Sequence, residues 1–219
     1  VAVSYMDWLL TQEQGYEQAR NLPRGFAEGR VSWLLDVPEL YRRRAPGNTC
    51  LSALRQKQIG GRLGSIASPQ NHSKGCGGVM RVAPLALRYD SQGELGILDR
   101  EGAEIAALTH GHPLGYMSAS GLVHVINRIV YPKHGMTLKE IVLEAVETAE
   151  EVFSGEPYLA ALVRILHRAA ALSENSERDI DNIRRLGEGW VAEETLAIAV
   201  YCALRYQNDF SAGIAAAVN

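Results

Sequence analysis

A glycine-rich string, SKGCGG at residues 73–78, is the stretch of this sequence best suited to hold a charged ligand. Successive glycines let backbone N–H groups turn toward an anion, and a helix start directly after them adds the positive end of its dipole. Lys74 would add charge and Ser73 a hydroxyl donor, which together suit a phosphate or diphosphate. The spacing is not that of a P-loop, because no Gly-Lys-Ser/Thr triplet ends the string. The alternative interpretation is a plain turn with flexible glycines.

Two histidines, His110 and His112, directly precede an apolar segment that begins at Pro113. Two ligands alone make a poor metal site, so we favour a binding role over metal coordination. An imidazole can instead form a hydrogen bond with a sugar or a base, and His110 is the candidate for that role. The alternative is a histidine that caps or bridges neighbouring helices.

An aromatic candidate, Trp190, follows a short segment with two glycines, Gly187 and Gly189. A ring in such a place can stack on a base. Glu193 and Glu194 come next, in the first turn of the following helical pattern, where carboxylates suit the helix dipole. We favour this structural role for the two glutamates over catalysis.

A polar pair, Asn48 and Thr49, begins another helical pattern. Asn or Thr ahead of a helix is usually a cap, and we prefer that interpretation. The alternative is that Asn48 contacts a ligand.

The segments that carry these residues have helical periodicity almost throughout, and strand alternation is nearly absent. Proline and glycine content predicts loops over residues 23–46 and 59–78. Pro113 and Pro157 suit the first turn of a helix, and Thr137 begins a capping box. The sequence therefore predicts an all-α fold. The expected helices are 1–14, 48–58, 79–88, 94–109, 113–131, 137–153, 158–172, 179–185, 191–206 and 208–219.

Length and composition suit one globular domain over residues 1–219, with 47% hydrophobic residues to form its core. The formal net charge of -3 gives no bias toward a nucleic-acid or membrane partner, and we expect neither. Three widely spaced cysteines argue against a disulfide scaffold and fit a reducing compartment, so we expect a cytoplasmic protein. No apolar run reaches the length of a membrane span.

Four segments resemble the ADP-ribosylglycohydrolase family in their order and approximate spacing. They are RAPGNTCLSAL (44–54), SKGCGGVMRVAPLAL (73–87), LTHGHPLGY (108–116) and AEETLAIAVYCAL (192–204). The name-giving relative is the dinitrogenase-reductase-activating glycohydrolase. The resemblance implies a compact, multi-helix orthogonal bundle and hydrolysis of the bond between ADP-ribose and a protein side chain or related acceptor.

The resemblance also implies where the ligand lies. The family's glycine string wraps the diphosphate and ribose of ADP-ribose, the histidine of its Leu-Thr-His string lies near the ligand, and Trp190 matches a position that can approach the adenosine. Asn48 falls in the site region. The implied substrate-binding residues are Asn48, Ser73, Lys74, Gly75, Cys76, Gly77, Gly78, His110 and Trp190, with Lys74 and Cys76 at family-variable positions. A catalytic glutamate of the family has no counterpart here, so no catalytic residue is assigned.

The family's metal ligands have no counterpart in this sequence either. Two Mg²⁺ ions are usually held by a Thr-Asp-Asp-Thr-like motif and an Asp-x-Asp-Ser/Thr motif. Here Asp209 is followed by Phe210, and residues 179–181 lie in a different context. The resemblance places Val1 just after the first motif and Asn219 just before the second, so the bundle looks truncated at both ends. Because magnesium needs several oxygen ligands held together, we expect the 219-residue chain alone to be inactive as a hydrolase.

Three functions stay open at this point. The chain is part of an active ADP-ribosyl hydrolase, a metal-free module that binds ADP-ribose or a nucleotide, or an inactive interaction scaffold. The expected partner is ADP-ribose or an ADP-ribosylated protein. The sequence does not indicate which ADP-ribosyl linkage is cleaved, nor the oligomeric state.

Overall fold

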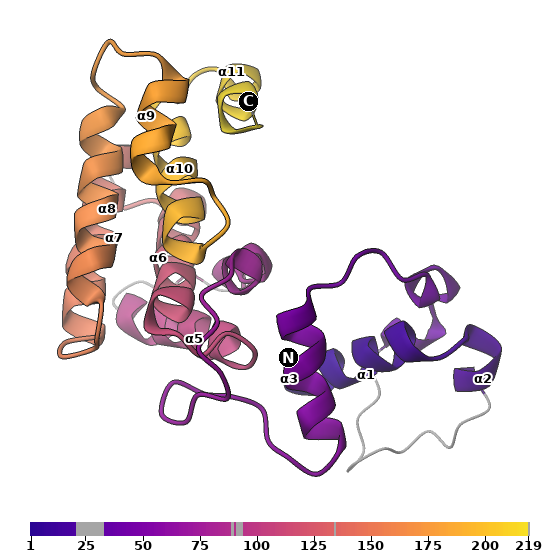
Figure 1. The fold of residues 1–219 in the computed structure, drawn as a ribbon. Coiled ribbons are helices and arrows are strands. Elements are labelled where there is room, and N and C mark those ends of the chain that lie inside the picture. Colours follow the sequence, from indigo (N-terminus) through magenta and orange to yellow (C-terminus); the bar gives the residue numbers. More distant parts are fainter. Residues whose placement is uncertain (21–32, 89, 91–93, 134, 219) are drawn as a thin grey trace. The chain divides into compact units, whose positions relative to one another are not determined.

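The structure of this protein is a computed structural model that describes residues 1–20, 33–88, 90, 94–133 and 135–218. Within these ranges the chain forms α-helices and short 3-10 helices and no β-strand, so the predicted all-α fold is confirmed (Figure 1). None of the described helices has the length and hydropathy needed to span a membrane. The backbone divides into a small unit, residues 1–64, and a large unit, residues 65–219. One domain over residues 1–219 stays a prediction.

The small unit is built on two amphipathic helices whose apolar faces share a core. Its elements are α1 (Ala2–Glu13), α2 (Tyr16–Arg20), η1 (Trp33–Asp36), η2 (Pro38–Tyr41) and α3 (Asn48–Gln58). Leu9 of α1 and Leu51 and Leu54 of α3 are buried against one another. The short α2 was not predicted. The expected loop over 23–46 contains η1 and η2, and its part up to residue 32 lies outside the described residues.

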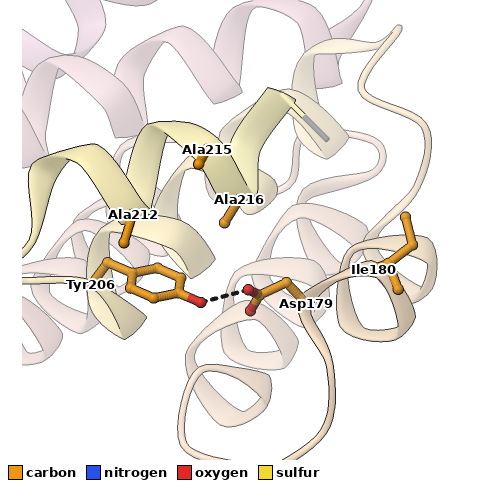
Figure 2. Close-up of a pocket in the computed structure, with 6 residues that line it drawn as sticks. All are labelled: Asp179, Ile180, Tyr206, Ala212, Ala215 and Ala216. Atoms are coloured by element: carbon orange, nitrogen blue, oxygen red, sulfur yellow. Dashed lines mark hydrogen bonds between the residues drawn. The ribbon is translucent and has the colours of Figure 1, made fainter.

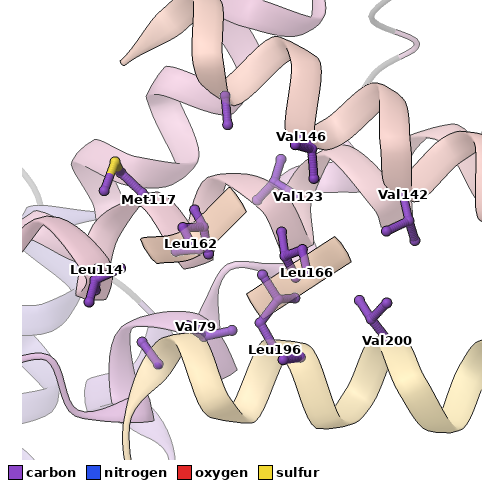
Figure 3. Close-up of a cluster of buried hydrophobic side chains, with 14 of the residues drawn as sticks. Val79, Leu114, Met117, Val123, Val142, Val146, Leu162, Leu166, Leu196 and Val200 are labelled. Carbon is purple, nitrogen blue, oxygen red and sulfur yellow. The ribbon is translucent and has the colours of Figure 1, made fainter. Parts of the chain in front are cut away.

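The large unit holds the remaining elements, and most of their bounds match the predicted helices. They are η3 (Cys76–Arg81), α4 (Ala83–Ala86), α5 (Leu95–Ala107), α6 (Pro113–Val130), α7 (Leu138–Val152), α8 (Leu159–Leu172), α9 (Asp179–Leu186), α10 (Ala192–Arg205) and α11 (Phe210–Val218). The longest of these, α6, packs against α5, α7, α8 and α10. Figure 3 shows the core that results, with Val123 of α6 among Val146, Leu166 and Leu196 from the helices around it.

Local sequence signals explain several helix starts. Thr137 forms the predicted capping box of α7, in which its Oγ1 accepts from the Glu140 N–H at 3.3 Å and Glu140 Oε2 accepts from the Thr137 N–H at 2.7 Å. Pro113 is the first residue of α6, as predicted. The prediction for Pro157 is wrong. Tyr158 is the N-cap of α8, with a φ of 68°, so Pro157 lies outside the helix.

The helix predicted over 79–88 is also wrong in its bounds and type. A 3-10 helix already begins at Cys76, inside the predicted loop, and it ends at Arg81, before the short α4. Pro84 explains the break, because it has no N–H to continue a helix and suits a first turn, where it lies in α4. Gly78 lies inside this 3-10 helix, and its backbone packs so closely against α5 that a Cβ there would lie 3.1 Å from the Cβ of Ala106.

Candidate functional site

The glycine string lies beside the segment that precedes α10, although more than a hundred residues separate them in sequence. Gly75 and Val191 form an isolated antiparallel bridge, and the Lys74 carbonyl accepts from the Ala192 N–H at 2.8 Å. This pairing places Trp190, the residue before Val191, next to the string. The structure thus brings together two segments that the sequence treated as separate candidates.

The side chain of Asn71 joins the string to the turn that carries His110. Asn71 Oδ1 accepts from the Ser73 N–H at 2.9 Å and from the Gly111 N–H at 3.2 Å. Asn71 Nδ2 donates to the Thr109 carbonyl at 2.9 Å. One amide therefore fixes both loops at once. Its position ahead of the string offered no sequence signal for this role, because Asn is common in any loop.

The imidazole of His110 is buried against the backbone of the string. Its exposed fraction is 3%, and a Cβ on Gly75 would lie 3.6 Å from His110 Nε2. Its other nitrogen, Nδ1, lies 2.8 Å from Thr109 Oγ1. Burial, and secondly the charge of Arg81, lowers the pKa of His110 from 6.5 to about 4. The ring is therefore neutral at pH 7, with its Nε2 edge toward Gly75.

This pKa makes the stability of the folded chain depend on pH. Below pH 6.5 the unfolded chain protonates His110, whereas the folded chain does so only near pH 4, so acid favours unfolding. At pH 4.5 the loss amounts to about 2–3 kcal/mol. The free energy of unfolding should be measured with urea at pH 7.5 and at pH 4.5. Its decrease between the two pH values should be larger in the wild type than in His110→Asn by this amount. An equal loss in both proteins would contradict the assignment.

His112 serves the fold, as the capping alternative proposed. Its Nδ1 accepts from the Leu114 N–H at 3.1 Å and so caps α6. Its ring packs on Tyr158, with centroids 4.7 Å apart. Burial lowers the pKa of His112, and the charge of Lys74 acts in the same direction. His112 is therefore a neighbour of the string that holds the end of α6 in place.

Lys74 forms an ion pair with Glu193 across the same junction. Lys74 Nζ donates to Glu193 Oε1, and the carboxylate is buried, with an exposed fraction of 7% for the residue. Glu193 Oε2 is buried as well and has no hydrogen-bond partner among the described residues. Sequence reasoning missed this pairing, because a separation of 119 residues carries no periodic signal.

Glu194 has the structural role that its position predicted, and the contact is specific. Its Oε2 accepts from the N–H groups of Glu188 at 3.0 Å and Gly189 at 3.2 Å. Gly187 has a φ of 129°, and a Cβ there would lie 2.3 Å from Glu194 Cδ. These contacts fix the turn that presents Trp190, whose exposed fraction is 76%.

The remaining candidate residues are those of the glycine string itself and Asn48 of the small unit. Ser73 Oγ accepts from the Gly75 N–H at 3.4 Å, and Cys76, Gly77 and Gly78 are the first residues of η3. Cys76 is a half-buried free thiol. Asn48 is exposed and belongs to the small unit. Its predicted role as a cap is wrong, because Gly47 is the N-cap of α3 and no side chain caps the helix.

A separate pocket of about 370 Å³ lies between α9, the end of α10 and α11 (Figure 2). Ala212, Ala215 and Ala216 form one wall, and Asp179 and Tyr206 face it, with the Tyr206 hydroxyl 2.5 Å from Asp179 Oδ2. The second oxygen of Asp179 accepts from the Tyr201 hydroxyl and from Arg205 at 3.0 Å. None of the predicted site residues lines this pocket, and its carboxylate is already engaged.

A metal site cannot be assigned to the described part of the chain. Within it, no three His, Cys, Asp or Glu side chains form a group that could hold a metal ion.

The family of the chain follows from comparison with known proteins. A sequence model described as ADP-ribosylglycohydrolase matches residues 1–219, which is the whole of the chain. No solved structure matches it. The match agrees with the all-α fold and with the order of the four motifs, and it supports a function of the glycohydrolase type. The chain belongs to the ADP-ribosylglycohydrolase family.

Proposed function

We propose that this chain binds ADP-ribose as part of a hydrolase that removes ADP-ribose from a protein side chain or a related acceptor. One observation carries the proposal. The glycine string, the His110 turn and the Trp190 segment meet in the large unit, joined by Asn71 and by the bridge between Gly75 and Val191. Family membership supports the hydrolase class, and this convergence supports the ligand.

The start of η3 is the part of this region that suits the diphosphate. The first N–H groups of any helix have no acceptor within the helix, so the N–H groups at the start of η3, that of Gly77 above all, are the proposed donors to the diphosphate. Within the string, the ammonium of Lys74 is paired with Glu193, and an ammonium has three N–H donors. A donor that Glu193 does not use would form a charge-assisted contact with a phosphate oxygen, which is stronger than one between neutral groups.

The two rings flanking the string suit the rest of ADP-ribose. His110 is neutral and presents Nε2 beside Gly75, where it can form a hydrogen bond with a ribose hydroxyl. Trp190 is exposed on the turn that Glu194 fixes, where its ring can stack on the adenine. The base, the sugar and the diphosphate thus each have a proposed contact in the large unit.

Hydrolysis adds water across the bond between ADP-ribose and its acceptor and regenerates the free side chain. The family resemblance adds two Mg²⁺ ions to this proposal, and the three widely spaced cysteines add a cytoplasmic location. Within the described part of the chain, no three His, Cys, Asp or Glu side chains are grouped as a metal site would need, so the proposal names no metal ligand there. The proposed roles of this chain's residues are to bind and orient the ligand.

Two measurements on the 219-residue chain test the proposal. Calorimetric titration with ADP-ribose should give binding, and ADP or ribose 5-phosphate alone should bind more weakly, since each lacks part of the contacts. Release of ADP-ribose from a modified protein should then be measured with and without magnesium. We expect binding without release in either condition, because the family's metal-ligand motifs have no counterpart in these 219 residues. Release by this chain in magnesium would contradict that expectation, and no binding at all would contradict the proposal and identify a scaffold.

Gly77→Val should weaken ADP-ribose binding, because a branched Cβ blocks the approach of a ligand to the backbone at the start of η3. We expect a loss of about tenfold or more, the equivalent of one hydrogen bond to a charged group. Gly77→Ala should give a smaller loss, and urea unfolding of both variants checks that the large unit remains folded. Unchanged affinity in a folded Gly77→Val protein would remove the string from the site.

A further inference from the structure

We infer that Arg81 and Thr109 are positioning residues, which hold the imidazole of His110 with its Nε2 edge toward the glycine string. The inference deepens the proposed function and rests on it, since it assigns to His110 a contact with the bound ligand. It concerns two residues that do not themselves reach the string.

The three side chains form a continuous hydrogen-bonded chain. Arg81 Nη1 donates to Thr109 Oγ1 at 2.7 Å, and Thr109 Oγ1 lies 2.8 Å from His110 Nδ1. Thr109 has no exposed surface, and His110 has almost none. Because Nδ1 is occupied by Thr109, Nε2 is the ring nitrogen left to meet a ligand.

Arg81 is itself anchored at a second point. Its Nη2 donates to the carbonyls of Ile105 at 2.6 Å and Ala106 at 2.9 Å, in the last turn of α5. A cation at a helix C-terminus is favoured by the helix dipole, and the planar guanidinium fixes its donors in one geometry. The hydroxyl of Thr109 therefore receives its hydrogen bond from a group that does not rotate freely.

One short helix connects this anchor to the ligand-binding backbone. Arg81 is the last residue of η3, and Cys76, Gly77 and Gly78 are its first. The same six residues thus carry the proposed diphosphate contacts at one end and the guanidinium at the other. Any shift of η3 would move the string and the orientation of His110 together.

The Nε2 edge of the ring lies against the backbone of the string. A Cβ on Gly75 would lie 3.6 Å from His110 Nε2 and 3.7 Å from Cδ2, so this edge faces the place that a side chain at residue 75 would occupy. Among the described residues, Nε2 has no hydrogen-bond partner. The ring is thus held by one nitrogen and presents the other beside the string.

The charge of Arg81 supports the same role. It lowers the pKa of His110 in addition to the effect of burial, and it is the charged group that faces the ring. A neutral imidazole keeps one nitrogen as donor and the other as acceptor, so the contact with a sugar hydroxyl survives across the physiological range.

The test compares Thr109→Val, which has nearly the same shape but no hydroxyl, with the conservative Thr109→Ser. We expect Thr109→Val to weaken ADP-ribose binding about tenfold, and Thr109→Ser to remain within about twofold of the wild type. The ¹⁵N shifts of the His110 imidazole, followed by NMR in protein without ligand, should change in Thr109→Val and not in Thr109→Ser. A merely structural role for Thr109 would leave the two nitrogens of the ring as they are.

Arg81→Met tests the charge separately. In this variant the pH below which ADP-ribose affinity falls should move upward, because His110 then takes up a proton more readily. If Arg81→Met does not fold, Gly75→Ala is tested in its place. The Cβ added at residue 75 would make only ordinary contact with the His110 ring, but it would stand between Nε2 and a ligand. We expect Gly75→Ala to keep the wild-type urea midpoint and to lose about tenfold in affinity.

Two results would overturn the inference. One is a Thr109→Val protein whose imidazole shifts and affinity equal those of the wild type. The other is a Gly75→Ala protein with undiminished affinity. These results can be told apart from a failure of the proposed function. If the wild type does not bind ADP-ribose, the proposed function fails, and the imidazole shifts of Thr109→Val still show whether Thr109 orients His110.

Discussion

Replacing Gly111 with alanine is expected to lower the free energy of unfolding of the large unit by about 3 kcal/mol or more. A Cβ at this position would lie 2.3 Å from the Asn71 carbonyl oxygen and 2.8 Å from the Cβ of Pro69. The backbone of one loop would have to move. That movement would break the hydrogen bonds through which Asn71 holds Thr109 and Ser73. The same variant should lose ADP-ribose binding, because the string and the His110 turn would separate.

Gly213→Ala in α11 is the matched control. It makes the same chemical change, but the nearest atom to the new Cβ is the Cβ of Tyr206 at 3.4 Å. Alanine also has the higher helix propensity, so this variant should be neutral or more stable by up to about 1 kcal/mol. Urea unfolding of both variants with the wild type makes the comparison. Equal stability of the two variants would contradict the close approach of the loops.

Phe153→Ala is expected to cost about 3–5 kcal/mol, the range for truncating a buried aromatic side chain. Phe153 follows α7 and is only 1% exposed within the main core. Its ring packs against that of Tyr116, with centroids 6.2 Å apart. Alanine would leave a cavity between α6 and α7 that neighbouring side chains fill only in part.

The chain offers a control with the same substitution on the surface. Phe210 opens α11 and is 82% exposed, so Phe210→Ala should change stability by less than about 0.5 kcal/mol. Thermal and urea unfolding of the two variants should therefore differ by several kcal/mol. A small effect at Phe153 would contradict its place in the core.

The parts of this fold that could be predicted are those that local sequence controls. The bounds of α3 match the predicted range of 48–58, and the capping box at Thr137 marks the start of α7. In both, a periodic apolar face marks the helix, and at α7 the capping box also marks its start; tertiary packing then favours the same conformation. The prediction fails at η3, a 3-10 helix that spans the boundary between the predicted loop and the predicted helix and in which the Gly78 backbone packs closely against α5.

The candidate site divides in the same way. Its residue types could be recognised, because glycines before a helix, a histidine at a helix junction and a tryptophan after two glycines each have a known chemistry. Their contacts could not, because Asn71, Arg81 and the pair of Lys74 with Glu193 act across loops and helices. Such contacts follow from the packing of α5, α6 and α10, which periodicity alone does not specify.

The junction of Lys74 and Gly75 with residues 191–193 also has a consequence for the rates of folding and unfolding. Contacts between residues more than a hundred positions apart close a long loop, so they form late, after the helices between them have assembled. Substitutions there should therefore leave the folding rate nearly unchanged and accelerate unfolding. A ligand bound at this junction would slow unfolding, and the lifetime of the native state would then report its occupancy.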